Sequence, residues 1–110
     1  MSVGSPRAAI YVEHQRAGEL SKSESGYTFV YSPEYLRSLH PRPVSFSLPL
    51  REAPYQSPRL FSYFDGLLPE GWLLEVTARA SKIDENDKFG LLLHTGRDPI
   101  GVVSVRPLDV

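Results

Sequence analysis

The order of its extended and helical segments is the feature that most constrains how this chain can fold. Alternating apolar and polar residues predict a strand over 8–13, and residues 16–20 are expected to return as the second strand of a hairpin. β-Branched and aromatic residues predict a third strand over 27–31, and a last strand is expected over 100–105. Helical spacing dominates the stretch between the third strand and the last one. Strands followed by helices and one closing strand predict an α+β fold, with a small, largely antiparallel β-sheet and helices packed on one side. Because the chain has 110 residues, we expect a single domain over residues 1–110.

A further strand is predicted over 44–50, where apolar residues alternate with serine and proline. The segment 51–59 is polar, contains proline and is predicted to be a loop. A short helix should begin after Ser32, and longer helices should cover 69–81 and 84–95, the latter capped by Asp84. The residues expected to share one core are Val44, Phe46, Leu48, Leu73, Val76, Phe89, Leu92, Val102 and Val105.

The segment 61–72, with the sequence FSYFDGLLPEGW, joins an aromatic cluster to a turn and a new helix. Its Phe and Leu residues suit a core, whereas Trp72, the only tryptophan, follows a glycine at the helix start. We expect Trp72 to point outward as an interface anchor, because Leu73, Val76 and Ala80 already form the stripe expected to face the core. The alternative is an indole folded back onto its own segment. The predicted partner-binding residues are Phe64, Asp65, Leu68, Pro69, Glu70, Gly71 and Trp72.

No pattern in the sequence indicates catalysis. The net charge of −1 argues against a nucleic-acid surface, and the absence of cysteine excludes disulfides and thiolate chemistry. The three histidines stand too far apart in the sequence to suggest a metal site, and no phosphate-binding loop or nucleophile motif is present. We therefore expect a binding module that is not an enzyme and has no cofactor. With neither a secretory signal nor a membrane span in the sequence, a cytoplasmic location is expected.

Six segments in a fixed order resemble the N-terminal subdomain of the HipA-type serine/threonine kinase toxins. The resemblance extends from about residue 8 to residue 107. The segments are QRAGEL (15–20), GYTFVYSPEYL (26–36), RPVSFSLPL (42–50), FSYFDGLLPEG (61–71), DKFGLL (87–92) and GRDPIGVVSV (96–105). In that family the subdomain precedes the kinase body, which carries the ATP-binding and catalytic residues, so the resemblance transfers none of them to this chain. The sequence departs from the family pattern at Gly71 and Trp72, which directly follow the LLPE motif.

A free-standing copy of this subdomain resembles the HipS antitoxins of three-gene HipBST toxin–antitoxin systems. The resemblance implies that the chain binds and neutralises a HipT-like kinase toxin lacking this subdomain. It further implies a ternary complex with a HipB-like DNA-binding protein, without direct contact between this chain and nucleic acid. Two alternatives stay open, namely an excised piece of a longer HipA-like kinase and an adaptor that binds the HipB-like partner. An independent enzyme is a third class, which the missing catalytic constellation disfavours.

Overall fold

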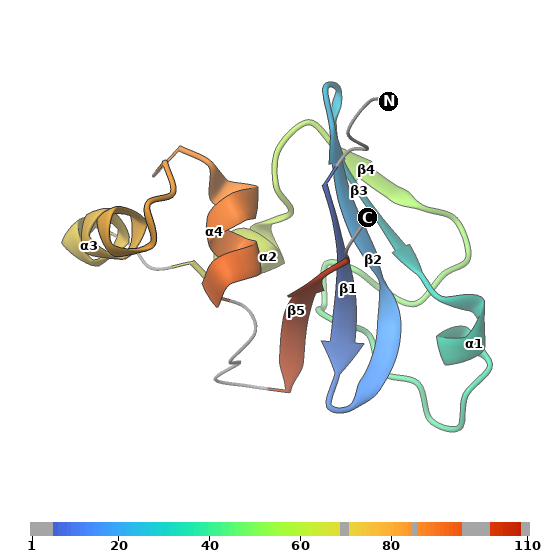
Figure 1. Cartoon of the computed structure of the whole chain (residues 1–110). Coiled ribbons are helices and arrows are strands. Elements are labelled where there is room, and N and C mark those ends of the chain that lie inside the picture. The colour runs from blue at the N-terminus through green and yellow to red at the C-terminus, as the bar shows by residue number, and fades with distance from the viewer. Residues whose placement is uncertain (1–5, 69–70, 85, 96–101, 109–110) are drawn as a thin grey trace.

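A five-stranded antiparallel sheet forms the body of the protein (Figure 1). The computed structural model describes residues 6–68, 71–84, 86–95 and 102–108 of the chain. The strands lie in the order β4-β3-β2-β1-β5. Their bounds are Arg7–Val12 (β1), Gln15–Ser23 (β2), Gly26–Tyr31 (β3), Tyr55–Ser57 (β4) and Val103–Pro107 (β5). The predicted antiparallel α+β fold is confirmed.

The hairpin of β1 and β2 turns at Glu13 and His14, one residue before the predicted break. Glu13 adopts a φ of 58°, in the left-handed region that tight turns require. Its backbone N–H donates to the carbonyl of Val102 at 2.6 Å, which ties the turn to the start of β5. The last strand begins three residues later than predicted, at Val103, and Ile100 and Gly101 lie outside the described residues.

Four helices complete the described elements: α1 (Pro33–Leu36), α2 (Ser62–Asp65), α3 (Gly71–Ser81) and α4 (Lys88–Thr95). The predicted start of α4 at Asp84 is wrong. The Asp84 carboxylate accepts a hydrogen bond from the backbone N–H of Asn86 at 2.8 Å, which forms a local turn. The cap is Asp87, whose Oδ1 accepts from the backbone N–H of Gly90 at 3.0 Å.

The core lies between one face of the sheet and the elements that cover it. Alternate strand residues such as Ile10, Leu20 and Phe29 are fully buried there. Phe64 of α2 and the apolar side of α4 pack against them. From the predicted core set, Val44, Leu48, Phe89, Leu92 and Val105 are buried as expected.

The predicted strand over 44–50 does not form. Only an isolated bridge joins Ser45 and Leu48, and the backbone makes a tight turn between them. Val44 and Leu48 still point into the core, whereas Phe46 is fully exposed, contrary to the prediction. Proline on both sides removes backbone donors that a ladder needs, and the strand partner of β3 is instead β4, in a segment predicted to be a loop.

Three other predicted core residues are also exposed: Leu73 (50%), Val76 (45%) and Val102 (51%). The first two belong to α3, whose inner side carries buried Ala78 and half-buried Leu74 instead. The helix was correctly predicted, but the side of it that faces the protein was not. Leu74 and Ala78 form their own i, i+4 pair, so the sequence contains two apolar stripes and only one is covered.

Candidate partner-binding surface

Phe64, an aromatic residue of the predicted binding segment, packs into the core beneath α2 and does not face solvent. Phe64 is fully buried, and its ring lies 5.9 Å from that of Phe29 and 5.3 Å from that of Tyr63. Burial raises the pKa of the Tyr63 hydroxyl. Leu68 is also buried and belongs to the same core. These side chains fix the position of the segment, and a partner would meet the residues around them.

Among the described residues of the segment, Asp65 is charged and partly exposed. Its Oδ1 lies 3.0 Å from Nζ of Lys88, at the start of α4, and both side chains are about half exposed. The ion pair joins α2 to α4 across the surface. In such an exposed setting it contributes at most about 1 kcal/mol to stability, so it orients the two helices more than it holds them together.

Gly71 opens α3 with a φ of 59°, a left-handed conformation that favours glycine. It is exposed, and nothing lies within 4 Å of where a Cβ would stand. Pro69 and Glu70 lie outside the described residues, as does the side chain of Trp72. Their role in partner binding, including the outward orientation of Trp72, therefore stays a prediction.

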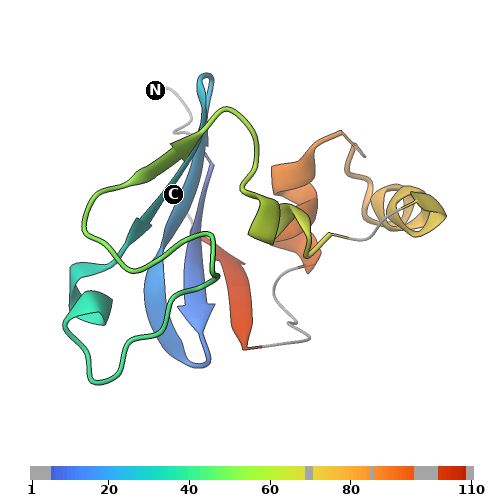
Figure 2. The same ribbon diagram turned by 180° about the vertical axis from the view of Figure 1, so that it is seen from behind.

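The exposed side of α3 carries Leu73, Val76 and Ala80, which we call the α3 stripe. These residues are spaced three and four apart, so they lie on one side of the helix. In both views α2 and α4 lie between α3 and the sheet, and α3 forms one end of the molecule (Figures 1 and 2). An apolar stripe on a helix at the end of the molecule is accessible to another protein.

Phe46 is another exposed apolar residue that was predicted to lie in the core. It stands on the connection between α1 and β4, where Leu39 is also 85% exposed. The signals that could have identified its position are Ser45 and Ser47, because serine on either side of one residue favours a turn as readily as a strand.

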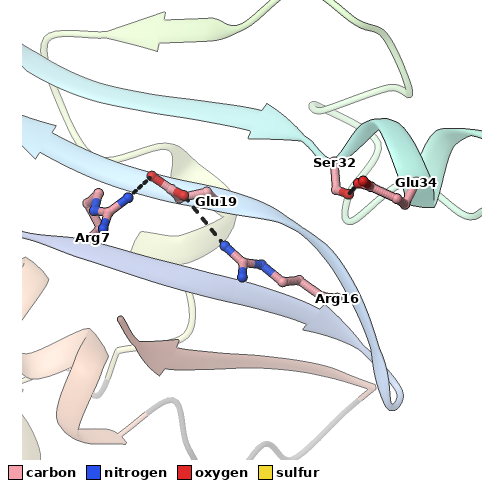
Figure 3. Close-up of polar contacts among 5 residues, drawn as sticks. All are labelled: Arg7, Arg16, Glu19, Ser32 and Glu34. Carbon is pink, nitrogen blue, oxygen red and sulfur yellow. Dashed lines mark hydrogen bonds and ion pairs between the residues drawn. The ribbon is translucent and has the colours of Figure 1, made fainter. Parts of the chain in front are cut away.

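A groove of about 540 Å³, lined by both apolar and charged residues, lies on another part of the surface, between α1 and strands β2 and β3. Figure 3 shows Glu19 accepting from Arg7 at 3.4 Å and approached by Arg16 at 3.5 Å. The Ser32 hydroxyl donates to Glu34 at 2.7 Å, and this hydrogen bond lowers the pKa of that carboxyl. Arginines and glutamates alternate in the lining, so the groove offers no single charge that would select an ion.

The described residues contain no group of three His, Cys, Asp or Glu side chains placed to hold a metal ion. Over the same residues, no helix has the length and apolar character needed to cross a bilayer. The two apolar surfaces are thus the features of the described chain that most favour a function, and both favour contact with a protein.

Comparison with known proteins gives one consistent relationship. The model of the family described as HipA N-terminal domain matches residues 8–106. An uncharacterized protein of Haemophilus influenzae is 35% identical over 97 residues, which is 88% of each chain. A solved structure described as the N-terminal domain of HipA toxin superposes with a TM-score of 0.74 at 30% identity, covering 99% of this chain and 98% of the other.

A second relative shows this fold as part of a larger protein. The putative kinase Y4mE of Sinorhizobium fredii is 36% identical over 81 residues, which cover 74% of this chain. Those residues make up only 19% of the putative kinase. The same domain is therefore found both as most of a short protein and as a small part of a long one.

Proposed function

This chain belongs to the HipA N-terminal domain family, and from that premise we propose that it is an antitoxin for a HipA-like serine/threonine kinase toxin. The kinase would be of the HipT type, which lacks its own copy of the domain, and the chain would bind it and suppress its activity. The chain itself would catalyse no reaction. The α3 stripe is the observation that carries this proposal, because Leu73 and Val76 are exposed where an interface with the rest of a kinase would cover them.

The relatives support a role in trans. The putative kinase of Sinorhizobium fredii carries the domain within a single chain, next to the remaining four fifths of the protein. The relative from Haemophilus influenzae consists mostly of this domain. A domain that packs on a kinase in one chain keeps the surface for that contact when it is encoded alone, and it can then rebind such a kinase as a separate protein.

The mechanism follows from the position of the surface. A helix at one end of the molecule can enter a cleft of the kinase while the sheet remains outside it (Figure 1). Binding of this kind shifts the kinase toward whichever arrangement the helix fits, and it suppresses phosphoryl transfer if that arrangement is inactive. We further propose that a HipB-like DNA-binding protein joins the two in a ternary complex, in the cytoplasm.

Titration of the chain into an autophosphorylation assay of a HipT-like kinase tests the proposal. Phosphate incorporation should fall to the background at a small molar excess of the chain. Undiminished incorporation at that excess would sink the antitoxin role. Pulldown with the kinase alone and with the HipB-like protein alone separates the antitoxin from the adaptor alternative, since only the adaptor would bind HipB without the kinase.

The double variant Leu73→Ser, Val76→Ser tests the surface itself. Both side chains are about half exposed, so the fold should tolerate the change, while kinase binding should weaken by at least about 2 kcal/mol. Val102→Ser is the matched control, because this valine is 51% exposed but lies outside α3. Equal loss of binding in both variants would show that the stripe has no special part in the interface.

Trp72→Ala tests the part of the surface predicted from sequence alone. The expected result is nearly unchanged thermal unfolding together with kinase binding weakened by about 2 kcal/mol or more. Earlier unfolding by several degrees, with the folded fraction still neutralising the kinase, would instead place the indole in the core.

A further inference from the structure

The turn over residues 44–48 presents Phe46 to solvent, while the residues at both ends of the turn are anchored in the core. Val44 and Leu48 at its two ends are buried, at 6% and 2% exposure, while Phe46 between them is fully exposed. The turn thus has two apolar residues fixed in the core and one directed away from it. The feature that this turn adds to an exposed apolar side chain is a backbone anchored in the core at both ends.

The hydroxyl of Tyr31 closes the base of this turn. It accepts a hydrogen bond from the backbone N–H of Val44 at 2.9 Å and donates one to the carbonyl of Leu48. Tyr31 itself is 1% exposed and belongs to β3, so the rigid sheet sets the position of the turn. One buried hydroxyl therefore holds both ends of the turn at the same time.

Hydrogen bonds within the turn also order the backbone around Phe46. The backbone N–H of Leu48 donates to the carbonyl of Ser45 at 3.0 Å, and that of Ser47 donates to the Ser45 hydroxyl at 3.1 Å. The two serine hydroxyls are also 2.9 Å apart. With its backbone already ordered, the turn loses little conformational freedom when it binds, which favours affinity.

The turn lies on the same side of the sheet as α2. Figure 2 shows the green connection between α1 and β4 crossing the sheet on the side that also carries α2. A row of rings joins the two places within the core: Tyr31 lies 4.8 Å from Phe29, and Phe29 lies 5.9 Å from Phe64 of α2. The turn and α2 thus lie on one side of the sheet and are anchored in the same core.

We propose that Phe46 is a second anchor for the same kinase body, entering an apolar pocket on it. The inference rests on the proposed function and adds a contact remote in sequence from α3. The kinase is the occupant because the turn and α2 lie on the same side of the sheet, and because in the putative kinase of Sinorhizobium fredii the rest of the chain is joined to this domain. Exposed aromatic residues on preorganised backbone are typical of interface hot spots.

The test compares Phe46→Ala with the wild-type chain for affinity to the HipT-like kinase, by calorimetry or surface plasmon resonance. Thermal unfolding should be unchanged, because the Phe46 ring is fully exposed, while the Kd should rise about 30-fold. Leu39→Ala is the matched control: this residue is also apolar and 85% exposed on the same connection, but lies outside the turn. It should bind like the wild type.

The outcomes separate this inference from the proposed function. A wild-type chain that fails to bind the kinase overturns both. If the wild type binds and Phe46→Ala changes the Kd by less than twofold, the anchor is wrong and the antitoxin role stands. Equal weakening by Leu39→Ala, or earlier unfolding of Phe46→Ala, also overturns the anchor, because the effect then does not arise from a specific contact of the exposed ring.

Discussion

Replacing Tyr31 by phenylalanine removes one oxygen atom and tests the hydrogen bonds at the base of the Phe46 turn. The ring can keep its place against Phe29 at 4.8 Å, so the core loses almost no apolar contact. What changes is that the N–H of Val44 and the carbonyl of Leu48 lose their common partner. Both residues are buried, which limits how well water can replace the hydroxyl.

The expected loss of stability follows from those two backbone groups. Each buried polar group left without a partner costs about 1–3 kcal/mol, so the loss of two partners should lower the free energy of unfolding by about 2–6 kcal/mol. Domains of this size unfold with an entropy that makes 1 kcal/mol worth about 4 °C. The midpoint of thermal unfolding should therefore drop by roughly 8–24 °C. Kinase binding should weaken as well, because the turn that presents Phe46 is no longer fixed.

The pH dependence gives a second measurement on the same pair of proteins. Burial raises the pKa of Tyr31 to about 12, although the Val44 N–H acts in the opposite direction. In the unfolded chain this pKa is about 10. A pKa raised by folding means that the contribution is complete below pH 10 and is lost as the pH rises through 12. The wild type should lose about 2–3 kcal/mol over that interval through Tyr31 alone.

Urea denaturation followed by circular dichroism, at several pH values, measures both effects. The stability difference between wild type and Tyr31→Phe should be largest below pH 10 and should shrink toward pH 12. The other tyrosines titrate in both proteins, so they largely cancel in the difference. A difference under about 0.5 kcal/mol at pH 7 would show that the hydroxyl does not hold the turn. A difference that stays constant up to pH 12 would contradict the burial argument.

Three further variants test the helical half of the domain by chemical denaturation. Asp87→Ala should cost about 1 kcal/mol, because its carboxylate caps α4 through the N–H of Gly90, and an unchanged midpoint would refute the cap. Asp65→Asn should cost less than about 1 kcal/mol, and the effect should fade at high salt, because its pair with Lys88 is exposed; a salt-independent loss would contradict this. Phe64→Ala should cost about 3–5 kcal/mol, and a loss below 1 kcal/mol would show that its site is not tightly packed.

Local signals predicted the first three strands of the sheet well. The three strands β1, β2 and β3 are neighbours in sequence and in space, so short-range patterns were sufficient. The strand β4 was missed, since its three residues pair with β3 only through tertiary context. The segment 44–50 has the clearest alternation of all and is not a strand, because the buried Tyr31 hydroxyl takes up the backbone groups that a ladder would use.

The location of the partner-binding site stays a prediction, and the structure changes which of its residues can reach a partner. The segment from α2 to α3 was identified from its aromatic residues and its turn, and the structure places Gly71 and Asp65 at the surface there. Phe64 and Leu68 were proposed as partner contacts on the same grounds, yet they are buried. A short aromatic segment does not itself reveal which rings point inward, because a four-residue helix is too short for its apolar period to be measured.

The errors in α3 and at Phe46 have a common physical origin. An apolar stripe or an alternating apolar pattern indicates that a set of side chains is buried away from water. It does not indicate whether the same chain or a partner protein buries them. In a domain that is found both alone and within a larger kinase, both kinds of cover are encoded together. Leu73, Val76 and Phe46 fit the patterns of buried residues, and the isolated domain leaves them exposed. At these three positions the disagreement between the core pattern and the observed exposure is what we expect of side chains that a partner covers.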